Sequence, residues 1–118
     1  MIIGIGLDLV EISRIEKAHK QSSRFAKRIL SSREYQIFEK LSTHRQIEYL
    51  AGRFAAKEAY AKAKGTGIGE GCSFTQIEII NEANGKPVLY FEEQAVKGFI
   101  SITHTQSVAA AQVILEDT

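Results

Sequence analysis

The sequence predicts an α+β fold in which an N-terminal strand and helices are followed by an antiparallel sheet. Helix-start signals before apolar stretches gather in the first half of the 118 residues. Segments rich in β-branched and aromatic residues, separated by turn signals, fill much of the second half. Helices first and strands later are typical of α+β folds with an antiparallel sheet. We expect one domain spanning residues 1–118.

The first half contains one expected strand and several helix starts. Residues 2–10 are almost continuously apolar apart from two glycines, which predicts a buried strand. At Ser13, Ser31 and Thr43, a Glu or Gln follows a hydroxyl side chain by three residues, the pattern of a capping box. The helix from Thr43 should end at Lys64, because the glycine that follows adopts the left-handed conformation at no steric cost.

The second half is expected to be mainly strands, at residues 74–80, 88–91, 99–103 and 108–115. Asn84-Gly85 favours a tight hairpin turn between the first two, because both residue types tolerate positive φ angles. Residues 92–97 are compatible with a short helix or a turn.

Composition limits the possible function classes. The chain is 44% hydrophobic and 25% charged, as in ordinary soluble globular proteins. Its one cysteine, Cys72, excludes an intramolecular disulfide and indicates a reducing compartment. The first residues lack the features of a signal peptide, and no apolar run approaches the ~20 residues that a spanning helix needs. We expect a cytoplasmic protein that does not bind a membrane.

Charge is unevenly distributed along the chain. Residues 1–64 hold 13 Lys/Arg against 7 Asp/Glu, whereas residues 65–118 hold 2 against 7. The excess in the first half includes a run at helical spacing: Arg14, Lys17, Lys20, Arg24, Lys27 and Arg28. The run is either a solvated helix face or a docking surface for an acidic protein or a nucleic acid. Phe25 is the only aromatic residue interleaved with it, which disfavours RNA binding by base stacking.

Asp8 is the first candidate for chemistry, because it lies within an apolar strand. A buried carboxylate is costly unless it is paired or bound to a metal. The alternative is a structural Asp that caps the following turn or pairs with an arginine. Glu11 lies near the same strand end and could add oxygen ligands.

Glu58 lies between two cations, Lys57 and Lys62, on an alanine-rich helix. Glu58 and Lys62 alone are best explained as an exposed ion pair worth roughly 0.2–0.5 kcal/mol. Together with Asp8, Glu58 would supply the two carboxylates of a Mg²⁺ site whose shell is completed by waters and phosphate oxygens. Lys62 would then neutralise a phosphate. Sequence spacing does not show that Asp8 and Glu58 meet.

Two other features carry weaker signals. The loop Gly65-Thr66-Gly67-Ile68-Gly69 could lie close to a ligand, but it lacks the spacing of a nucleotide-binding fingerprint or a P-loop, which disfavours ATP hydrolysis. Its alternative is a flexible loop. His104 lies at an expected strand end, and a lone histidine is more often a structural hydrogen-bonding residue than a catalytic one. We interpret Cys72 as a packing residue.

Five segments in a fixed order carry a family resemblance: residues 4–12, 54–59 with Lys62, 65–68, 84–87 and 101–105. Together they resemble the holo-acyl-carrier-protein synthase family, the small class of 4′-phosphopantetheinyl transferases. The resemblance implies transfer of the 4′-phosphopantetheine arm from coenzyme A to a serine of apo acyl carrier protein, in support of fatty acid biosynthesis. It further implies Mg²⁺ as cofactor, adenosine 3′,5′-bisphosphate as by-product, and a homotrimer with active sites at subunit interfaces.

The resemblance also assigns residues. Asp8 and Glu58 become metal ligands, and Lys62 contacts the pyrophosphate; these three form the catalytic set. The coenzyme A site would comprise Arg53, Lys62, Gly65, Thr66, Gly85, Lys86, Pro87 and His104. The hairpin would come from the neighbouring subunit, and His104 would approach the 3′-phosphate. The first helix would dock the acidic carrier protein through Arg14, Arg24 and Arg28. The general base remains open between Glu58, Asp8 and a metal-bound water. Two further classes compete: a non-catalytic module that binds acidic proteins, and an RNA-binding protein.

Overall fold

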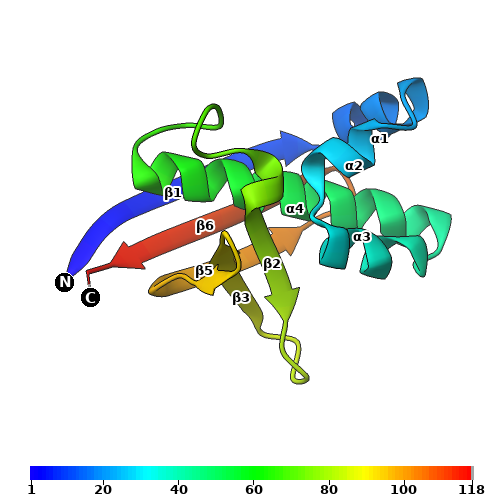
Figure 1. Ribbon diagram of the computed structural model, residues 1–118. Helices are drawn as coiled ribbons and strands as arrows, with labels where there is room; N and C mark the ends of the chain where they lie inside the picture. Colours follow the sequence, from blue (N-terminus) through cyan, green and yellow to red (C-terminus); the bar gives the residue numbers. More distant parts are fainter. Residues whose placement is uncertain (118) are drawn as a thin grey trace.

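The computed structural model describes residues 1–117, which form an α+β fold as expected (Figure 1). Its elements are β1 (Ile2–Glu11), α1 (Ile12–Gln21), α2 (Phe25–Ile29), α3 (Ser32–Glu39), α4 (Thr43–Lys64), the 3₁₀ turn η1 (Phe74–Gln76), β2 (Ile77–Asn81), β3 (Pro87–Phe91), β4 (Gln94–Ala95), β5 (Gly98–His104) and β6 (Val108–Glu116). No helix among these residues is both long and apolar enough to cross a bilayer.

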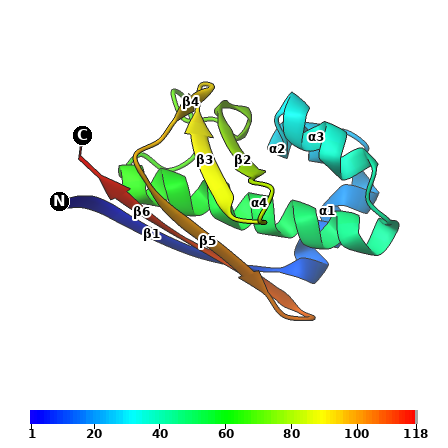
Figure 2. The same ribbon diagram turned by 90° about the horizontal axis from the view of Figure 1, so that it is seen from below.

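The strands form two antiparallel sheets of three strands each, in the orders β1-β6-β5 and β2-β3-β4. The N-terminal strand pairs with the C-terminal one, so the two ends of the described chain lie side by side, and the Met1 ammonium contacts Asp117 Oδ1 at 3.0 Å. Helix α4 lies along one face of the first sheet, while α1, α2 and α3 gather around its N-terminal half (Figures 1 and 2).

Strand β1 and helix α4 approach each other closely because glycine occupies the strand positions between them. A Cβ atom on Gly6 would lie 1.8 Å from Ala59 O, and one on Gly4 would lie 2.1 Å from Ala63 O. Ala59 and Ala63 are themselves small and buried. Since side chains alternate along a strand, Asp8 faces α4 as Gly4 and Gly6 do. The glycines therefore set the distance at which Asp8 meets the helix.

The expectation that β1 is a buried strand is wrong for its second face. Ile3, Ile5, Leu7 and Leu9 point away from α4 and are 59–67% exposed. Phe99 of β5, which is opposite the same β6 residue as Ile5, is also exposed. An apolar run with interspersed glycines does not reveal which of its two faces the rest of the chain covers. The exposed apolar face thus runs along β1 and reaches Phe99 of β5 through Ile114 of β6, which lies between them.

All three predicted helix starts correspond to helices, but only the one at Ser31 has the expected cap. The capping box at Ser31 is confirmed: Ser31 Oγ accepts from Glu34 N, and a Glu34 carboxylate oxygen accepts from Ser31 N at 2.9 Å. A helix does begin near Ser13, but the capping box there is wrong, because α1 begins at Ile12 and Glu11 takes the cap position. Strand β1 runs directly into α1, and the Ser13 hydroxyl therefore falls inside the helix.

At the start of α4 the cap is Ser42, whose hydroxyl accepts from Arg45 N, so Thr43 is the first helical residue rather than the cap. The end of α4 is confirmed, with Gly65 in the left-handed conformation at φ 88°.

In the second half, the strand expected at residues 74–80 begins later, because Phe74–Gln76 form a 3₁₀ turn. The hairpin between β2 and β3 has a five-residue loop rather than a two-residue turn, and within that loop Gly85 alone has a positive φ. Residues 92–97 contain a turn at Glu92-Glu93, which brings the short strand β4 beside β3. The final strand pair, β5 and β6, is confirmed.

Candidate active site

Helix α4 and strand β1 bring Asp8 and Lys62 into contact, although 53 residues separate them along the chain. Lys62 Nζ donates to Asp8 Oδ1 at 3.0 Å and to Leu7 O at 3.1 Å. The Asp8 side chain is mostly covered, whereas that of Lys62 is 54% exposed. Asp8 is thus a paired carboxylate, and its partner is a lysine that can move into solvent.

Glu58 lies beside this pair, one helical turn before Lys62. Partial burial raises the pKa of Glu58, the negative charge of Asp8 raises it further, and the Lys62 ammonium opposes both effects. The two carboxylates are therefore close enough to repel each other. The sequence-based expectation that Asp8 and Glu58 share one site is consistent with this electrostatic coupling.

This pair of carboxylates fits a Mg²⁺ ion better than a metal that needs a closed protein cage. Among residues 1–117, no group of three or more His, Cys, Asp or Glu side chains is arranged to hold a metal. Mg²⁺ is commonly bound by one or two carboxylates, with waters and substrate phosphates as the other ligands. The donor set and the electrostatic repulsion between Asp8 and Glu58 would both suit a divalent cation, which these two carboxylates would hold.

Glu11 does not add to this site. Strand alternation places Glu11 on the opposite face of β1 from Asp8, and Glu11 is exposed. It takes the cap position of α1 and lines a separate hollow of about 640 Å³ with Ile12 and Glu16. The suggestion of a site richer in oxygen ligands at this strand end is therefore wrong.

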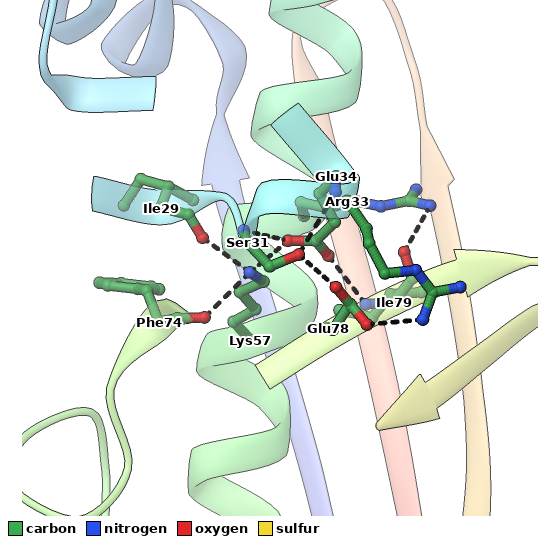
Figure 3. A network of polar contacts seen from close by, with 9 residues as sticks. Ile29, Ser31, Arg33, Glu34, Lys57, Phe74, Glu78 and Ile79 are labelled. Carbon is green, nitrogen blue, oxygen red and sulfur yellow. Dashed lines mark hydrogen bonds and ion pairs between the residues drawn. The ribbon is translucent and has the colours of Figure 1, made fainter. Parts of the chain in front are cut away.

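Lys57 does not flank Glu58 in space. Successive helical residues point about 100° apart, and Lys57 lies fully buried on another side of α4. Its ammonium group donates to Ile29 O at 2.7 Å, to Phe74 O at 2.9 Å and to the Glu34 carboxylate (Figure 3). Burial lowers the pKa of Lys57, and Glu34 partly offsets that effect.

Sequence reasoning missed the network around Glu34. This residue is fully buried and accepts hydrogen bonds from Lys57, from Ser31 N and from Ile79 N. Ser31 in turn donates to Glu78, which pairs with Arg33 (Figure 3). The capping-box pattern correctly placed Glu34 at a helix start, but nothing in the local pattern indicated a buried lysine partner.

The glycine loop begins next to the Asp8–Glu58 end of α4. Thr66 N and Gly67 N both donate to Ala61 O at 3.2 Å, so the loop folds back over the last helical turn. Gly65 and Gly67 have positive φ angles, and Gly65 and Thr66 are exposed. The loop thus offers accessible backbone beside Lys62.

Arg53 lies elsewhere, buried at the base of the β2–β3 hairpin. Its guanidinium donates to Ile79 O at 3.1 Å and to Asn81 Oδ1 at 3.2 Å, and lies 4.3 Å from the centroid of the Tyr49 ring. Only 7% of Arg53 is exposed. Within one chain, Arg53 therefore fixes strand β2 of the hairpin against α4.

The remaining coenzyme A candidates lie away from Asp8 and Glu58 in the same chain. Gly85, Lys86 and Pro87 belong to the hairpin that projects away from the loop following α4 (Figure 1). His104 ends β5, and its Nδ1 lies 3.8 Å from a carboxylate oxygen of Glu48. Glu48 precedes Glu58 by ten residues, about 15 Å along the helix axis. Within one chain, therefore, neither His104 nor the hairpin lies at the carboxylate pair.

The basic residues expected to form one docking helix lie on two. Helix α1 carries Arg14 and ends at Gln21; α2 then begins after Arg24 and carries Arg28. The chain turns between them, where the Ser22 hydroxyl accepts from Arg24 N at 3.2 Å. The three arginine side chains are exposed.

Comparison with known proteins assigns the family. The family model described as the 4′-phosphopantetheinyl transferase superfamily matches residues 4–114, so the chain belongs to this family. A holo-[acyl-carrier-protein] synthase from Shouchella clausii is 53% identical over 116 residues, covering 98% of this chain and 99% of the relative. A holo-[acyl-carrier-protein] synthase from a Geobacillus strain is 52% identical over 116 residues, with 98% of each chain covered.

Solved structures agree with these relatives. The crystal structure of a holo-(acyl-carrier-protein) synthase from Bacillus anthracis in complex with CoA (3′,5′-ADP) has a TM-score of 0.89 and 45% identity, covering 100% of this chain and 99% of that one. The Helicobacter pylori synthase in complex with coenzyme A has a TM-score of 0.82 and 32% identity, covering 95% and 99%. Within the superfamily, the chain thus groups with the holo-[acyl-carrier-protein] synthases.

Proposed function

We propose that this protein transfers the 4′-phosphopantetheine group of coenzyme A to a serine of apo acyl carrier protein, with Asp8, Glu58 and Lys62 as its catalytic set. The observation that carries the proposal is the meeting of a carboxylate from β1 with a carboxylate and a lysine from α4, in a chain whose relatives carry this activity in their names. The products are holo acyl carrier protein and adenosine 3′,5′-bisphosphate.

The transfer replaces the phosphoanhydride bond of coenzyme A with a phosphodiester bond to the carrier protein, and adenosine 3′,5′-bisphosphate leaves. The serine oxygen of the carrier protein forms a bond to the phosphorus that bears pantetheine, the bond between the two phosphates of coenzyme A breaks, and the serine proton is released. Asp8 and Glu58 would hold Mg²⁺, which when bound neutralises charge on the pyrophosphate. The nucleophile comes from the carrier protein. This chain therefore has to align the two substrates and neutralise the charge of the pyrophosphate, and it forms no covalent bond itself.

Lys62 is suited to neutralise the negative charge that develops on the leaving group. Its ammonium pairs with Asp8, but its side chain is more than half exposed and has room to turn towards a phosphate. A cation placed beside the breaking bond stabilises the departing bisphosphate more than the intact substrate. The exposed backbone of Gly65 and Thr66 lies next to Lys62 and lines the same coenzyme A site.

We further propose a homotrimer in which each active site is shared by two chains. The exposed apolar face of β1 and β5, with Leu7 and Phe99, supports burial against another copy, because a large unpartnered apolar patch is unusual on a monomer. The positions of the hairpin and of His104, remote from Glu58 within one chain, support their action at the site of a neighbour. There Gly85, Lys86 and Pro87 would line the coenzyme A pocket, with His104 near the 3′-phosphate.

The carrier protein would dock on α1 and α2 through Arg14, Arg24 and Arg28. Their exposure supports this role, because an acidic partner requires accessible cations. The reaction would take place in the cytoplasm and support fatty acid biosynthesis. The single cysteine, which is buried and unpaired, is consistent with a reducing compartment.

The experiment that tests the activity is intact mass spectrometry of apo acyl carrier protein after incubation with this protein, coenzyme A and Mg²⁺. The expected result is a gain of one phosphopantetheine group, which disappears when EDTA replaces Mg²⁺. Carrier protein that binds but never gains mass would instead identify a non-catalytic binding module. A mass gain that persists in EDTA would exclude the metal requirement but not the transferase activity.

A further inference from the structure

The Lys57 ammonium group joins three elements that are separate in the sequence. It donates to the last residue of α2 through Ile29 O, to the start of α3 through Glu34, and to the turn η1 through Phe74 O (Figure 3). Lys57 itself comes from the middle of α4 and is fully buried. All three protons of the ammonium are thus engaged in fixing its surroundings.

Glu34 holds this ammonium in place. One of its carboxylate oxygens accepts from Lys57 and from Ser31 N, and the other accepts from Ile79 N at 2.8 Å. The carboxylate is therefore tied to the backbone of α3 and to strand β2 at the same time. A charge fixed by these backbone donors gives Lys57 a defined position relative to β2.

Helix α2 depends on this contact for its location. With five residues it is too short to be stable alone, and it buries only Ala26 and Ile29. The carbonyl of Ile29 is one of the groups left unpaired at a helix end, and Lys57 donates to it at 2.7 Å. Lys57 thus fixes the C-terminal end of α2 against α4.

Helix α2 carries part of the proposed docking surface, and α4 carries the proposed metal ligand. Arg24 caps α2 and Arg28 lies in its last turn, both exposed. Glu58 follows Lys57 directly along α4 but points towards Asp8 instead. Adjacent residues of one rigid helix therefore face the docking segment and the reaction site.

We propose that Lys57, held by Glu34, is a positioning residue that fixes α2 relative to Glu58, so that a docked carrier protein presents its serine at the right place. The inference rests on the proposed transferase function and on the docking role of α2. Alignment of the two reactants is the main task in such a transfer, and a displacement of ~1 Å can lower the rate by about 10²-fold.

The test uses a variant that removes both buried charges together, Lys57→Met with Glu34→Gln, so that no unpaired charge is left inside the protein. Steady-state transfer is measured while apo carrier protein and coenzyme A are varied separately. We expect the KM for carrier protein to rise about tenfold and kcat to fall because the serine is misplaced, while the KM for coenzyme A changes less than about twofold. A purely structural role would lower the amount of active enzyme and leave both KM values unchanged, which would overturn the proposal.

A second, more conservative variant keeps the proposal testable if the double variant does not fold. Lys57→Arg keeps the charge and the Glu34 partner, but its larger head group must push α2 away from α4, so a smaller rise in the carrier-protein KM is expected. Val113→Ala is the control for stability alone, because it opens a cavity in the β6 core without touching the network. Its two KM values should match those of the unmodified protein.

A variant of the docking surface distinguishes failure of the Lys57 proposal from failure of the proposed function on which it rests. Arg24→Glu with Arg28→Glu should raise the carrier-protein KM by itself. If this variant has an effect and the Lys57 variants do not, Lys57 does not position α2. If it has no effect while the unmodified protein still transfers the group, the docking assignment is wrong. If the unmodified protein gives no transfer, the proposed function fails first.

Discussion

Lys62 Nζ lies 3.0 Å from Asp8 Oδ1, so that the last turn of α4 is joined to β1 close to Glu58, whose pKa the Asp8 charge raises. The Lys62 side chain is more than half exposed, so solvent screens the pair, and ion pairs of this kind contribute only about 0–1 kcal/mol to stability. Its value to the protein therefore lies in placing a mobile cation beside two carboxylates.

Lys62→Met should lower kcat by about 10²-fold or more, because it removes a cation that stabilises charge on the leaving group. The free energy of unfolding should change by less than about 1 kcal/mol, since the Lys62 side chain is mostly exposed. Transfer rates and denaturant unfolding measure the two effects. Lys64→Met is the matched control, because Lys64 lies in the same helical turn but is held over the Phe91 ring at 3.8 Å. Equal losses in both variants would argue against a specific role for Lys62.

Gly6→Ala should destabilise the protein, because the new Cβ would lie 1.8 Å from Ala59 O and push β1 away from α4. Overpacking of this kind costs about 1–3 kcal/mol, which denaturant unfolding can measure. Gly69→Ala is the control, because a Cβ there meets no atom within 4 Å and its φ is not positive. A Gly6→Ala protein as stable as the control would contradict the close packing of β1 on α4.

Leu7→Glu should disrupt the proposed trimer, since it places a charge in the centre of the exposed apolar face. The expected result in sedimentation analysis is a trimer for the unmodified protein and a smaller species for the variant, with transfer activity lost in parallel. Ile37→Glu is the control, because Ile37 is a partly exposed apolar residue on α3, remote from this face. A monomeric unmodified protein with full activity would rule out shared active sites.

His104→Ala should raise the KM for coenzyme A and leave the KM for 3′-dephospho-coenzyme A nearly unchanged. The reason is that a histidine that contacts the 3′-phosphate has no partner in the analogue. The KM for coenzyme A should rise about 10-fold or more, as expected for loss of a charge-assisted hydrogen bond worth roughly 1.5–3 kcal/mol. His44→Ala is the control, because His44 contacts the same Glu48 carboxylate but lies in α4. An equal change for both substrates would exclude the 3′-phosphate contact.

Local signals predicted the helices better than they predicted burial. The capping box at Ser31 and the glycine after Lys64 act through neighbouring backbone atoms, and both predictions are confirmed. The apolar run of β1 predicted burial on both faces. Whether its outward face is covered depends on partners that sequence periodicity cannot reveal.

The candidate site was predictable in its residue types but not in its geometry. Asp8 and Lys62 were singled out by charge within apolar or alanine-rich surroundings, and the fold brings them together. Lys57 was grouped with Glu58 because the two are adjacent in the sequence, yet adjacent helical residues face different neighbours. Its partner Glu34 is 23 residues away, and only the packing of α3 on α4 brings them into contact.

The most direct test of the central claim compares two carboxylate variants of β1 and α4 in the intact-mass assay with Mg²⁺ present. Glu58→Gln removes a proposed metal ligand, while Glu11→Gln alters an exposed carboxylate on the opposite face of β1 from Asp8. We predict that apo carrier protein gains no phosphopantetheine with folded Glu58→Gln protein and is fully modified with Glu11→Gln protein. Near-normal modification by Glu58→Gln protein would contradict the assignment of Asp8 and Glu58 as the catalytic metal site.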